Sequence, residues 1–395
     1  MSSVNSTALS IIIPIYNAES YVIRCLDSII MQAEKLSENT VEVICVDDGS
    51  KDESLSILNN YATEHERVRV IHEENAGPAA ARNAGLDMAR GEWIWFVDPD
   101  DYVDENAVEN ILSLISDDMD DQLVESSPCL IDFNTKRAAL SDVIMFDAYE
   151  HKTMVLEGGC PGKDNIRPWE HFSEDHVFTE EADLCAIQRL VLYPYVSGSE
   201  ESMFDSKGIK AYSTPIAAPW DKLYRRQFLT GNGLRFNENL RVLDDMFFNI
   251  QAFGATETVA YSKKKIYHYI RNSRSITATY TPDRIEKDRV VWKAIEEYID
   301  GLRDGDSELK KTLNKRIIKS FAIALKLSLF NTNNPKDIKN QMQEAREVLD
   351  IHEYKEAFGS VKLGEVEWRL RPVIICARIG WMSGLWLLTK MQEKI

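Results

Sequence analysis

Short apolar runs alternate with amphipathic stretches over the first 117 residues of the chain. The apolar runs are typical of strands buried on both faces of a parallel sheet, and they lie at Leu9–Tyr16, Val41–Val46, Val68–His72 and Trp93–Val97. The segments between them predict helices over about 20–32, 50–65, 77–90 and 105–116. The second helix would open on a capping box at Ser50–Glu53. Because strands and helices alternate, the sequence predicts a parallel sheet wound with helices.

Polar side chains stand at the carboxyl ends of three of these strands. Tyr16 ends the first run and Asp48 follows the second, while the fourth leads into Asp98, Asp100 and Asp101. Ligands of such sheets bind beyond the carboxyl ends of the strands. Neighbouring carboxylates repel one another, but a hard divalent cation takes oxygen ligands and leaves positions open for phosphate oxygens. The pattern therefore predicts a metal site at this edge, and the alternative is an acidic turn that leads into a helix.

Composition narrows the classes of function. The 395 residues are enough for roughly two to three domains, and a hydrophobic content of 44% supports a sizeable core. The net charge of −18 argues against nucleic acid as the main partner, since phosphate backbones are bound by basic surfaces. The six cysteines show no metal-ligand spacing and the sequence shows no secretory signal, so we expect reduced thiols in a cytoplasmic protein. No uncharged apolar run reaches the roughly eighteen residues expected of a transmembrane helix.

Four segments of this region together resemble the family 2 glycosyltransferases. They read Ile-Ile-Pro-Ile-Tyr-Asn-Ala-Glu (12–19), Val-Asp-Asp-Gly-Ser-Lys-Asp (46–52), Asn-Ala-Gly-Pro-Ala-Ala-Ala-Arg-Asn-Ala-Gly (75–85) and Val-Asp-Pro-Asp-Asp (97–101). They occur in the order and spacing of that family over residues 8–117. The resemblance implies a GT-A fold, with a mixed and mainly parallel sheet flanked by helices. It also implies an inverting enzyme that uses a nucleotide-activated sugar, and a UDP-sugar is favoured.

The resemblance assigns residues to the donor pocket. Pro14 and Tyr16 would line the pocket of the nucleotide base, and Asp48 would hydrogen-bond the base. Arg82 would reach the base or the diphosphate. The side-chain chemistry agrees, because an aromatic face stacks on a base and a guanidinium forks onto phosphate oxygens. The alternatives are an ordinary aromatic residue at a strand end for Tyr16 and a surface cation on a helix for Arg82.

The resemblance also implies a metal cofactor, Mn²⁺ or Mg²⁺. Asp98 would lie near the ribose and the metal, and Asp100 would be the main metal ligand. His268, in a strand predicted over Thr258–Tyr269, is a further candidate ligand.

Residues 217–253 carry the acceptor side of the resemblance. Trp220 is expected to contact substrate, and Asp245 aligns with the Asp that serves as catalytic base. Asp244 stands where family members commonly have Glu. Asp244 and Asp245 are adjacent carboxylates, which can raise one another's pKa, and a raised pKa suits a base. The alternative is a cap on the following helix. Further along, Arg271 and Arg274 lie in a segment that family members place over the diphosphate, unless it is an exposed basic turn.

The expected domains are a GT-A domain over 1–278 and a helical C-terminal region over 279–395. Residues 117–215 exceed what completes the fold, so we expect an insertion that shapes the acceptor side. It begins with a polar loop at 117–140 and contains a strand at 142–149 and a helix at 179–193. Helices of the C-terminal region are predicted to open at Thr281-Pro282 and Asn334-Pro335.

The tail from Ser360 differs from the rest, with six Lys and Arg residues against three Glu. Charge would come from Arg369, Arg371 and Arg378, and an apolar side from Trp381, Leu385, Trp386 and Leu388, on a helix mainly after Pro372. Basic residues and tryptophans on an amphipathic segment suggest contact with an anionic membrane surface. The alternative is that the tail packs on the protein or on a dimer partner.

These patterns predict an inverting, metal-dependent glycosyltransferase of cell-surface polysaccharide or glycolipid synthesis. Its acceptor would be a glycan or a lipid-linked molecule, and its location the cytoplasm or the inner face of the cell membrane. One rival is a sugar nucleotidyltransferase, which would lack the acceptor-side Asp-Asp-x-x-Phe segment. The other is a non-catalytic sugar-nucleotide or glycan-binding protein, which should have lost a metal carboxylate or the base.

Overall fold

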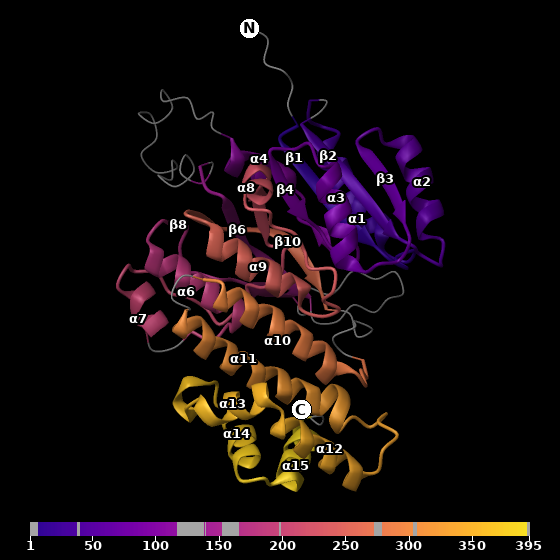
Figure 1. The fold of residues 1–395 in the computed structure, drawn as a ribbon. Helices are drawn as coiled ribbons and strands as arrows, with labels where there is room; N and C mark the ends of the chain where they lie inside the picture. The colour runs from indigo at the N-terminus through magenta and orange to yellow at the C-terminus, as the bar shows by residue number, and fades with distance from the viewer. Residues whose placement is uncertain are drawn as a thin grey trace.

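A computed structural model of the chain describes residues 7–37, 40–116, 138, 140–151, 166–196, 199–271, 279–302 and 306–392 (Figure 1). A twisted sheet flanked by helices forms one end of the molecule, and the C-terminal helices form the other. The predicted α/β class and the helical C-terminal region are confirmed. The loop predicted at 117–140 lies almost entirely outside the described residues. Arg274 also lies outside them. The domain boundary near residue 278 stays a prediction.

The sheet is mixed and mainly parallel. Its strands are β1 (Leu9–Ile15), β2 (Val41–Asp48), β3 (Val68–Glu73), β4 (Trp93–Phe96), β5 (Tyr102–Val103), β6 (Val143–His151), β7 (Ile166–Trp169), β8 (His176–Phe178), β9 (Lys222–Arg225) and β10 (Val259–Ile270). Their order is β3-β2-β1-β4-β9-β6-β10-β5, with β7 beside β6 and β8 beside β10. β3, β2, β1 and β4 run parallel, and β9 joins them to the parallel pair β6 and β10 by antiparallel pairing. The parallel half contains all four strands predicted from the N-terminal pattern.

Helices cover both faces of the sheet and build the C-terminal end. They are α1 (Val22–Ala33), α2 (Ser54–Glu64), α3 (Pro78–Met88), α4 (Ala107–Ile115), α6 (Glu181–Leu192), α7 (Ser199–Asp205), α8 (Arg226–Gly231), α9 (Asp244–Ala255), α10 (Arg284–Asp300), α11 (Ser307–Ala324), α12 (Ile338–Asp350), α13 (His352–Ser360), α14 (Arg371–Arg378) and α15 (Met382–Gln392). A π-helical turn, Leu325–Leu329, follows α11, and a 3₁₀ turn, Leu363–Glu365, precedes α14.

Three predicted helix starts are wrong. The capping box at Ser50–Glu53 does not form, because the Ser50 hydroxyl accepts a hydrogen bond from the Asn17 backbone N–H at 3.0 Å and α2 starts four residues later. α10 starts at Arg284, after Thr281-Pro282. α12 starts after Asn334-Pro335, where the Asp337 side chain caps it by accepting from the Asn340 N–H at 2.8 Å. At Ser50 the hydroxyl is bonded by a residue distant in the sequence, and at α12 the cap is Asp337, which comes after the predicted start.

Alternating strand residues build two apolar cores. Ile11 and Ile13 of β1 belong to the core that includes α1 and α4, whereas Ile12 belongs to the core that includes α3 and α9. The second core continues without a break through α10 and α11 to Leu385 of α15. The C-terminal helices therefore share the core that supports one face of the sheet.

Gly85 of α3 packs directly on this sheet face. A Cβ atom there would collide with the Ile12 side chain, whereas a Cβ at Gly359 of α13 would meet open space. We expect Gly85→Ala to destabilise the fold by about 1–3 kcal/mol through overpacking. Gly359→Ala should be neutral or stabilising by up to about 1 kcal/mol, because alanine favours a helix. Urea unfolding measures both, and equal midpoints for the two variants would contradict the close packing of α3 on β1.

Candidate functional site

The turn between β3 and α3 is held by Asp48, at the end of β2. Its carboxylate accepts hydrogen bonds from the backbone N–H groups of Ala76 at 2.7 Å and Gly77 at 3.0 Å, and from the Asn75 amide at 3.1 Å. Gly77 has a φ of +101°, a backbone conformation that favours glycine. The Asp48 oxygens thus fix the loop that leads into α3. Contact between Asp48 and a nucleotide base stays a prediction.

Arg82 of α3 joins the two halves of the candidate site. It is buried, and it forms ion pairs with Asp98 Oδ1 at 3.0 Å and with Asp244 Oδ2 at 3.1 Å. Its guanidinium also lies 5.2 Å from the ring centre of Phe236. Burial by itself lowers the pKa of Arg82, but the charges of Asp98 and Asp244 outweigh it and raise the pKa. The alternative of a surface cation is wrong, because this arginine holds two carboxylates that lie far apart in the sequence.

Asp100 and Asp101 have different surroundings although they are neighbours. Asp101 is fully buried, and its carboxylate accepts from the Tyr267 hydroxyl at 2.7 Å and the Ile270 N–H at 2.6 Å. Asp100 is partly exposed, and burial followed by the charge of Asp98 raises its pKa to about 6. Asp101 is therefore a structural anchor for β10. The negative charges of Asp98 and Asp100, in contrast, repel each other and are only partly neutralised by the protein.

This pair fits a divalent cation in its donor chemistry. The repulsion between Asp98 and Asp100 would be relieved by a hard cation that takes carboxylate oxygens. Within the described ranges, no group of three or more His, Cys, Asp or Glu side chains is placed so that it could hold a metal ion. Two carboxylates would thus hold the metal only together with other oxygen ligands, such as those of a bound diphosphate.

Asp244 and Asp245 begin α9. The preceding Leu243 has a left-handed backbone with φ of 57°, and no side chain caps the helix. The cap role considered for Asp244 is therefore wrong, since its side chain pairs with Arg82. Asp245 Oδ1 accepts from the Met246 N–H at 2.7 Å. Burial, and next the charge of Asp244, raises the pKa of Asp245 to about 7, in the range of a general base at neutral pH.

Trp220 is placed differently from its prediction. Only 4% of it is exposed, and its ring stacks on Tyr267 at 4.6 Å and on Tyr269 at 5.4 Å between ring centres. The backbone carbonyl of Trp220 accepts from the Trp95 indole at 2.8 Å. An indole so enclosed offers almost no surface to a ligand, so the structure does not support direct substrate contact. Trp220 instead packs the strand ends together.

His268 lies apart from the Asp98 and Asp100 pair. Its ring stacks on Tyr102 at 4.4 Å, its Nδ1 lies 2.8 Å from His151 Nε2, and its Nε2 lies 3.4 Å from Asp104. Among the described residues, His268 is part of no group of three His, Cys, Asp or Glu side chains that could hold a metal ion. This placement does not support His268 as a metal ligand beside Asp100.

The remaining predicted residues lie around the strand ends. Pro14 is buried within β1, whereas Tyr16 directly after it is 44% exposed and available to a ligand. Arg271, directly after β10, is exposed and forms an ion pair with Glu150 at 2.9 Å. Their roles toward a nucleotide stay predictions.

Two residues that support the site were not predicted. The Tyr267 hydroxyl accepts from the Asp98 N–H at 3.0 Å while it donates to Asp101, so it fixes the backbone of Asp98 and the carboxylate of Asp101. Phe236 underlies Arg82 and stacks on Phe248 of α9 at 4.1 Å. The Leu-Arg-Phe-Asn-Glu segment, 234–238, marked Phe236 as part of the resemblance without a role, and no sequence signal singled out Tyr267.

Comparisons with known proteins agree on one family. Residues 10–152 match the family model described as glycosyl transferase family 2. The putative glycosyltransferase EpsH of Bacillus subtilis is 29% identical over 69% of this chain and 63% of its own length. The uncharacterized glycosyltransferase EpsJ of the same organism is 28% identical over 85% and 82%. The poly(ribitol-phosphate) beta-glucosyltransferase of Bacillus spizizenii is 25% identical over 89% and 44%, so this chain spans less than two thirds of two of these relatives.

Solved structures show the same fold. Residues 1–349 of TarS from S. aureus, in complex with UDP-GlcNAc, superpose with a TM-score of 0.59 at 20% identity, over 98% of this chain and 92% of that one. The predicted GT-A fold is thereby confirmed. The family match and the named relatives also confirm the prediction of a glycosyltransferase enzyme at the level of the family. The resemblance to the family 2 glycosyltransferases is thus supported for residues 10–152, which match the model of that family.

Proposed function

We propose that the chain transfers a sugar from a UDP-sugar to an acceptor hydroxyl, with inversion at the anomeric carbon and Asp245 as the base. The observation that carries this proposal is the double ion pair of Arg82. It connects Asp98, at the predicted donor side, to Asp244, the neighbour of Asp245. Asp245, whose pKa is about 7, thus directly follows Asp244, and Arg82 connects Asp244 to Asp98 of the predicted donor side.

The residues present can perform the chemical step. Asp245, when deprotonated, accepts the proton of the acceptor hydroxyl as that oxygen attacks the anomeric carbon. The bond from that carbon to the diphosphate breaks on the opposite face, which inverts the configuration. A divalent metal, when bound by Asp98 and Asp100, would neutralise charge on the leaving diphosphate. Arg82 keeps Asp98 and Asp244 in place throughout.

The relatives support the choice of substrates. TarS has been solved with UDP-GlcNAc, which favours a UDP-sugar as donor here. The relative named poly(ribitol-phosphate) beta-glucosyltransferase favours a cell-surface polymer or its lipid-linked precursor as acceptor. A nucleotidyltransferase is disfavoured because the acceptor-side carboxylates are present and connected to the donor side by Arg82. A donor screen that scores UDP, GDP or dTDP release with Mn²⁺ or Mg²⁺ tests this assignment.

Asp245→Asn should leave UDP binding near normal and lower the transfer rate by about 10²–10⁴-fold, the usual loss for a positioned base. Because the base acts only when deprotonated and its pKa is raised to about 7, the rate of the unaltered enzyme should fall as pH drops below about 7 and level off above it. Turnover is followed as UDP release, and UDP binding by calorimetry.

The matched control is Asp205→Asn, which alters an exposed carboxylate on α7. It should change neither quantity. Normal turnover in Asp245→Asn would show that another group is the base. Loss of UDP binding in that variant would place Asp245 in the nucleotide pocket instead.

Asp100→Asn should abolish the Mn²⁺ dependence of UDP binding measured by calorimetry, because it removes the main predicted ligand, and should leave the melting temperature almost unchanged. Asp101→Asn should lower the melting temperature, since it disturbs two buried hydrogen bonds, and should keep Mn²⁺-dependent binding. Equal behaviour of the two variants in both measurements would refute the assignment of Asp100.

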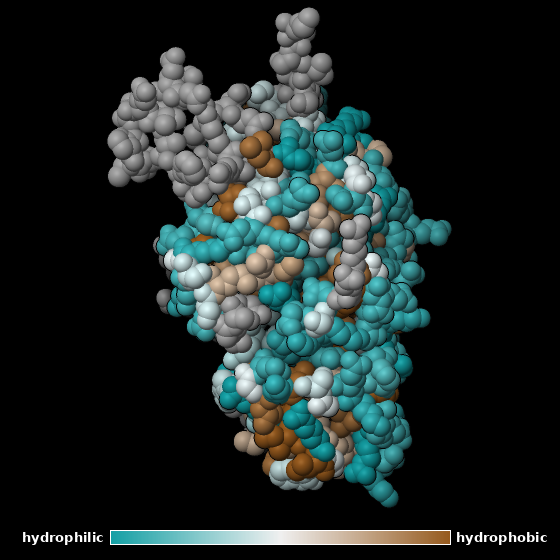
Figure 2. Space-filling view, turned by 60° about the vertical axis from the view of Figure 1, so that its left-hand side comes forward, coloured by the Kyte–Doolittle hydropathy of each residue, from teal (hydrophilic) through white to brown (hydrophobic). Residues whose placement is uncertain are grey.

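We also propose that the enzyme contacts an anionic membrane through the outer face of α14 and its flanking turns. Among the described residues, no helix is both long and apolar enough to cross a bilayer. Exposed apolar side chains nevertheless gather at this end of the molecule, and they include Trp368, Ile375, Ile379 and Trp381. Figure 2 shows a hydrophobic patch at the end that Figure 1 assigns to the C-terminal helices. Residues 368–391 contain Arg369, Arg371, Arg378 and Lys390 and no Asp or Glu, in a chain of net charge −18.

The residues of this face differ from those predicted. Leu385 is fully buried, and Trp386 and Leu388 pack against the core, so α15 mainly supports the fold. Trp368 and Ile379 are each 68% exposed and replace them as the apolar contacts. The helix expected mainly after Pro372 is confirmed, because α14 begins at Arg371 and the proline lies in its first turn, where it is tolerated.

Arg369→Gln combined with Arg371→Gln should weaken binding to anionic vesicles about 30-fold, because each basic residue near such a surface contributes about 1 kcal/mol. Co-flotation with phosphatidylglycerol vesicles at low salt measures the effect. The control pair, Lys293→Gln with Lys311→Gln, removes two exposed cations from α10 and α11 and should leave binding unchanged. Failure of the unaltered protein to float, or a stable dimer that buries this face, would overturn the membrane proposal.

A further inference from the structure

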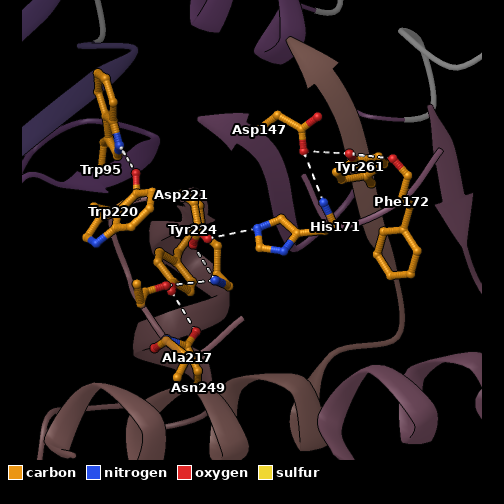
Figure 3. Close-up of polar contacts among 12 residues, drawn as sticks. Trp95, Asp147, His171, Phe172, Ala217, Trp220, Asp221, Tyr224, Asn249 and Tyr261 are labelled. Carbon is orange, nitrogen blue, oxygen red and sulfur yellow. Dashed lines mark hydrogen bonds and ion pairs between the residues drawn. The ribbon is translucent and has the colours of Figure 1, made fainter. Parts of the chain in front are cut away.

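A buried hydrogen-bond network joins Asn249 of α9 to Tyr224 of β9 (Figure 3), and it also reaches the backbone of the candidate base, Asp245. The Asn249 amide donates to the backbone carbonyls of Asp245 at 3.1 Å and Ala217 at 2.8 Å. Its carbonyl oxygen accepts from the Tyr224 hydroxyl at 2.7 Å. Asn249 and Tyr224 are both 0% exposed. Both amide hydrogens and the amide oxygen of Asn249 thus have partners, which fixes the side chain in one orientation.

The first turn of α9 has no side-chain cap, and Leu243 enters it in a left-handed conformation. The uncapped groups of a helix N-terminus are N–H donors, so the Asn249 amide, which also donates, does not cap them. It instead bonds the backbone of Asp245 itself and ties this turn to the chain that precedes β9. The direction in which the Asp245 side chain leaves the helix therefore depends on this amide.

Tyr224 connects the amide to the strand that leads to the metal carboxylates. On β9 it pairs with Ile94 of β4, and its ring lies edge-on to Phe96 of β4 at 5.9 Å between centres. β4 ends in Phe96, two residues before Asp98. The Tyr224 ring also lies edge-on to Phe248 of α9 at 5.4 Å. Tyr224 thus couples α9, which its hydroxyl bonds through Asn249, to β4, which its backbone and ring contact.

We propose that Tyr224 and Asn249 are positioning residues, which hold the Asp245 carboxylate at the geometry required for proton transfer. This inference rests on the proposed function, in which Asp245 is the base. Neither residue reaches a ligand, because both are completely buried. A small misplacement of a reacting group can lower a rate by as much as 10²-fold, so a network of this kind should affect turnover more than donor binding.

Tyr261 provides a matched control within the same figure (Figure 3). It is a tyrosine of β10 that is 2% exposed, and its hydroxyl donates to Asp147 Oδ1 at 2.6 Å and to the Phe172 carbonyl at 2.9 Å. These partners lie on β6 and in the segment before β8, and neither is a hydrogen-bond partner of Asn249 or Asp245. Tyr261→Phe and Tyr224→Phe therefore each remove one buried phenol hydroxyl and leave the ring in place, but only the second affects the Asp245 network.

The experiment measures UDP release from UDP-GlcNAc with Mn²⁺, together with the melting temperature, for the unaltered enzyme and three variants. Tyr224→Phe and Tyr261→Phe should both melt a few degrees lower, because each leaves a buried partner unsatisfied. At a temperature well below both transitions, Tyr224→Phe should lower kcat roughly 10- to 100-fold with KM unchanged. Tyr261→Phe should keep kcat within about twofold, because its hydroxyl does not touch the network. Asn249→Ala should reproduce the kcat loss of Tyr224→Phe.

The results distinguish a failure of the positioning role from a failure of the proposed function. If Tyr224→Phe and Tyr261→Phe have equal kcat values while Asp245→Asn is inactive, the positioning role is wrong and the proposed function stands. If Asp245→Asn releases UDP at the unaltered rate, the proposed function is wrong and the positioning role falls with it. A rise in KM without a change in kcat for Tyr224→Phe would also overturn the positioning role.

Discussion

The candidate site depends on one buried guanidinium. Arg82 forms ion pairs with Asp98, which follows β4 on the predicted donor side, and with Asp244, which begins α9 on the predicted acceptor side. Removing one partner of a buried ion pair leaves an uncompensated charge, at a cost of about 3–5 kcal/mol. Phe236 lies beneath the guanidinium, and Asp48 holds the turn that precedes α3, so both restrict where Arg82 can lie. The geometry of both carboxylates is therefore set by the position of α3 on the sheet.

A second level of support comes from aromatic side chains between the sheet and α9. Phe96, Tyr224, Phe236 and Phe248 contact one another at right angles or in stacks, so β4, β9 and α9 cannot shift independently. On the other face, Trp220 stacks on Tyr267, whose hydroxyl holds Asp98 and Asp101. The polar residues of the site thus rest on a rigid apolar base, as precise chemistry requires.

The sequence was most informative where local periodicity and short motifs determine the structure. The parallel strands and the acidic strand ends were predictable because each depends on consecutive residues. The pairing of Arg82 with Asp244 was not, since 162 positions separate the two residues. The orientation of His268 was not predictable either, because irregular pairing at Lys265 changes which face of β10 the following residues occupy. The burial of Trp220 was not predictable because a buried aromatic residue near a strand end looks the same in sequence as one that binds a ligand.

The unbroken apolar core that runs from β1 to α15 has a consequence for motion. Parts of a chain move as separate bodies when the surface between them is small and polar, whereas a large apolar interface suppresses hinge movement. Ile12 of the sheet and Leu385 of the last helix belong to one apolar cluster. Hinge closure between the sheet and the C-terminal helices would have to break that cluster. The sheet and the C-terminal helices therefore form one rigid platform.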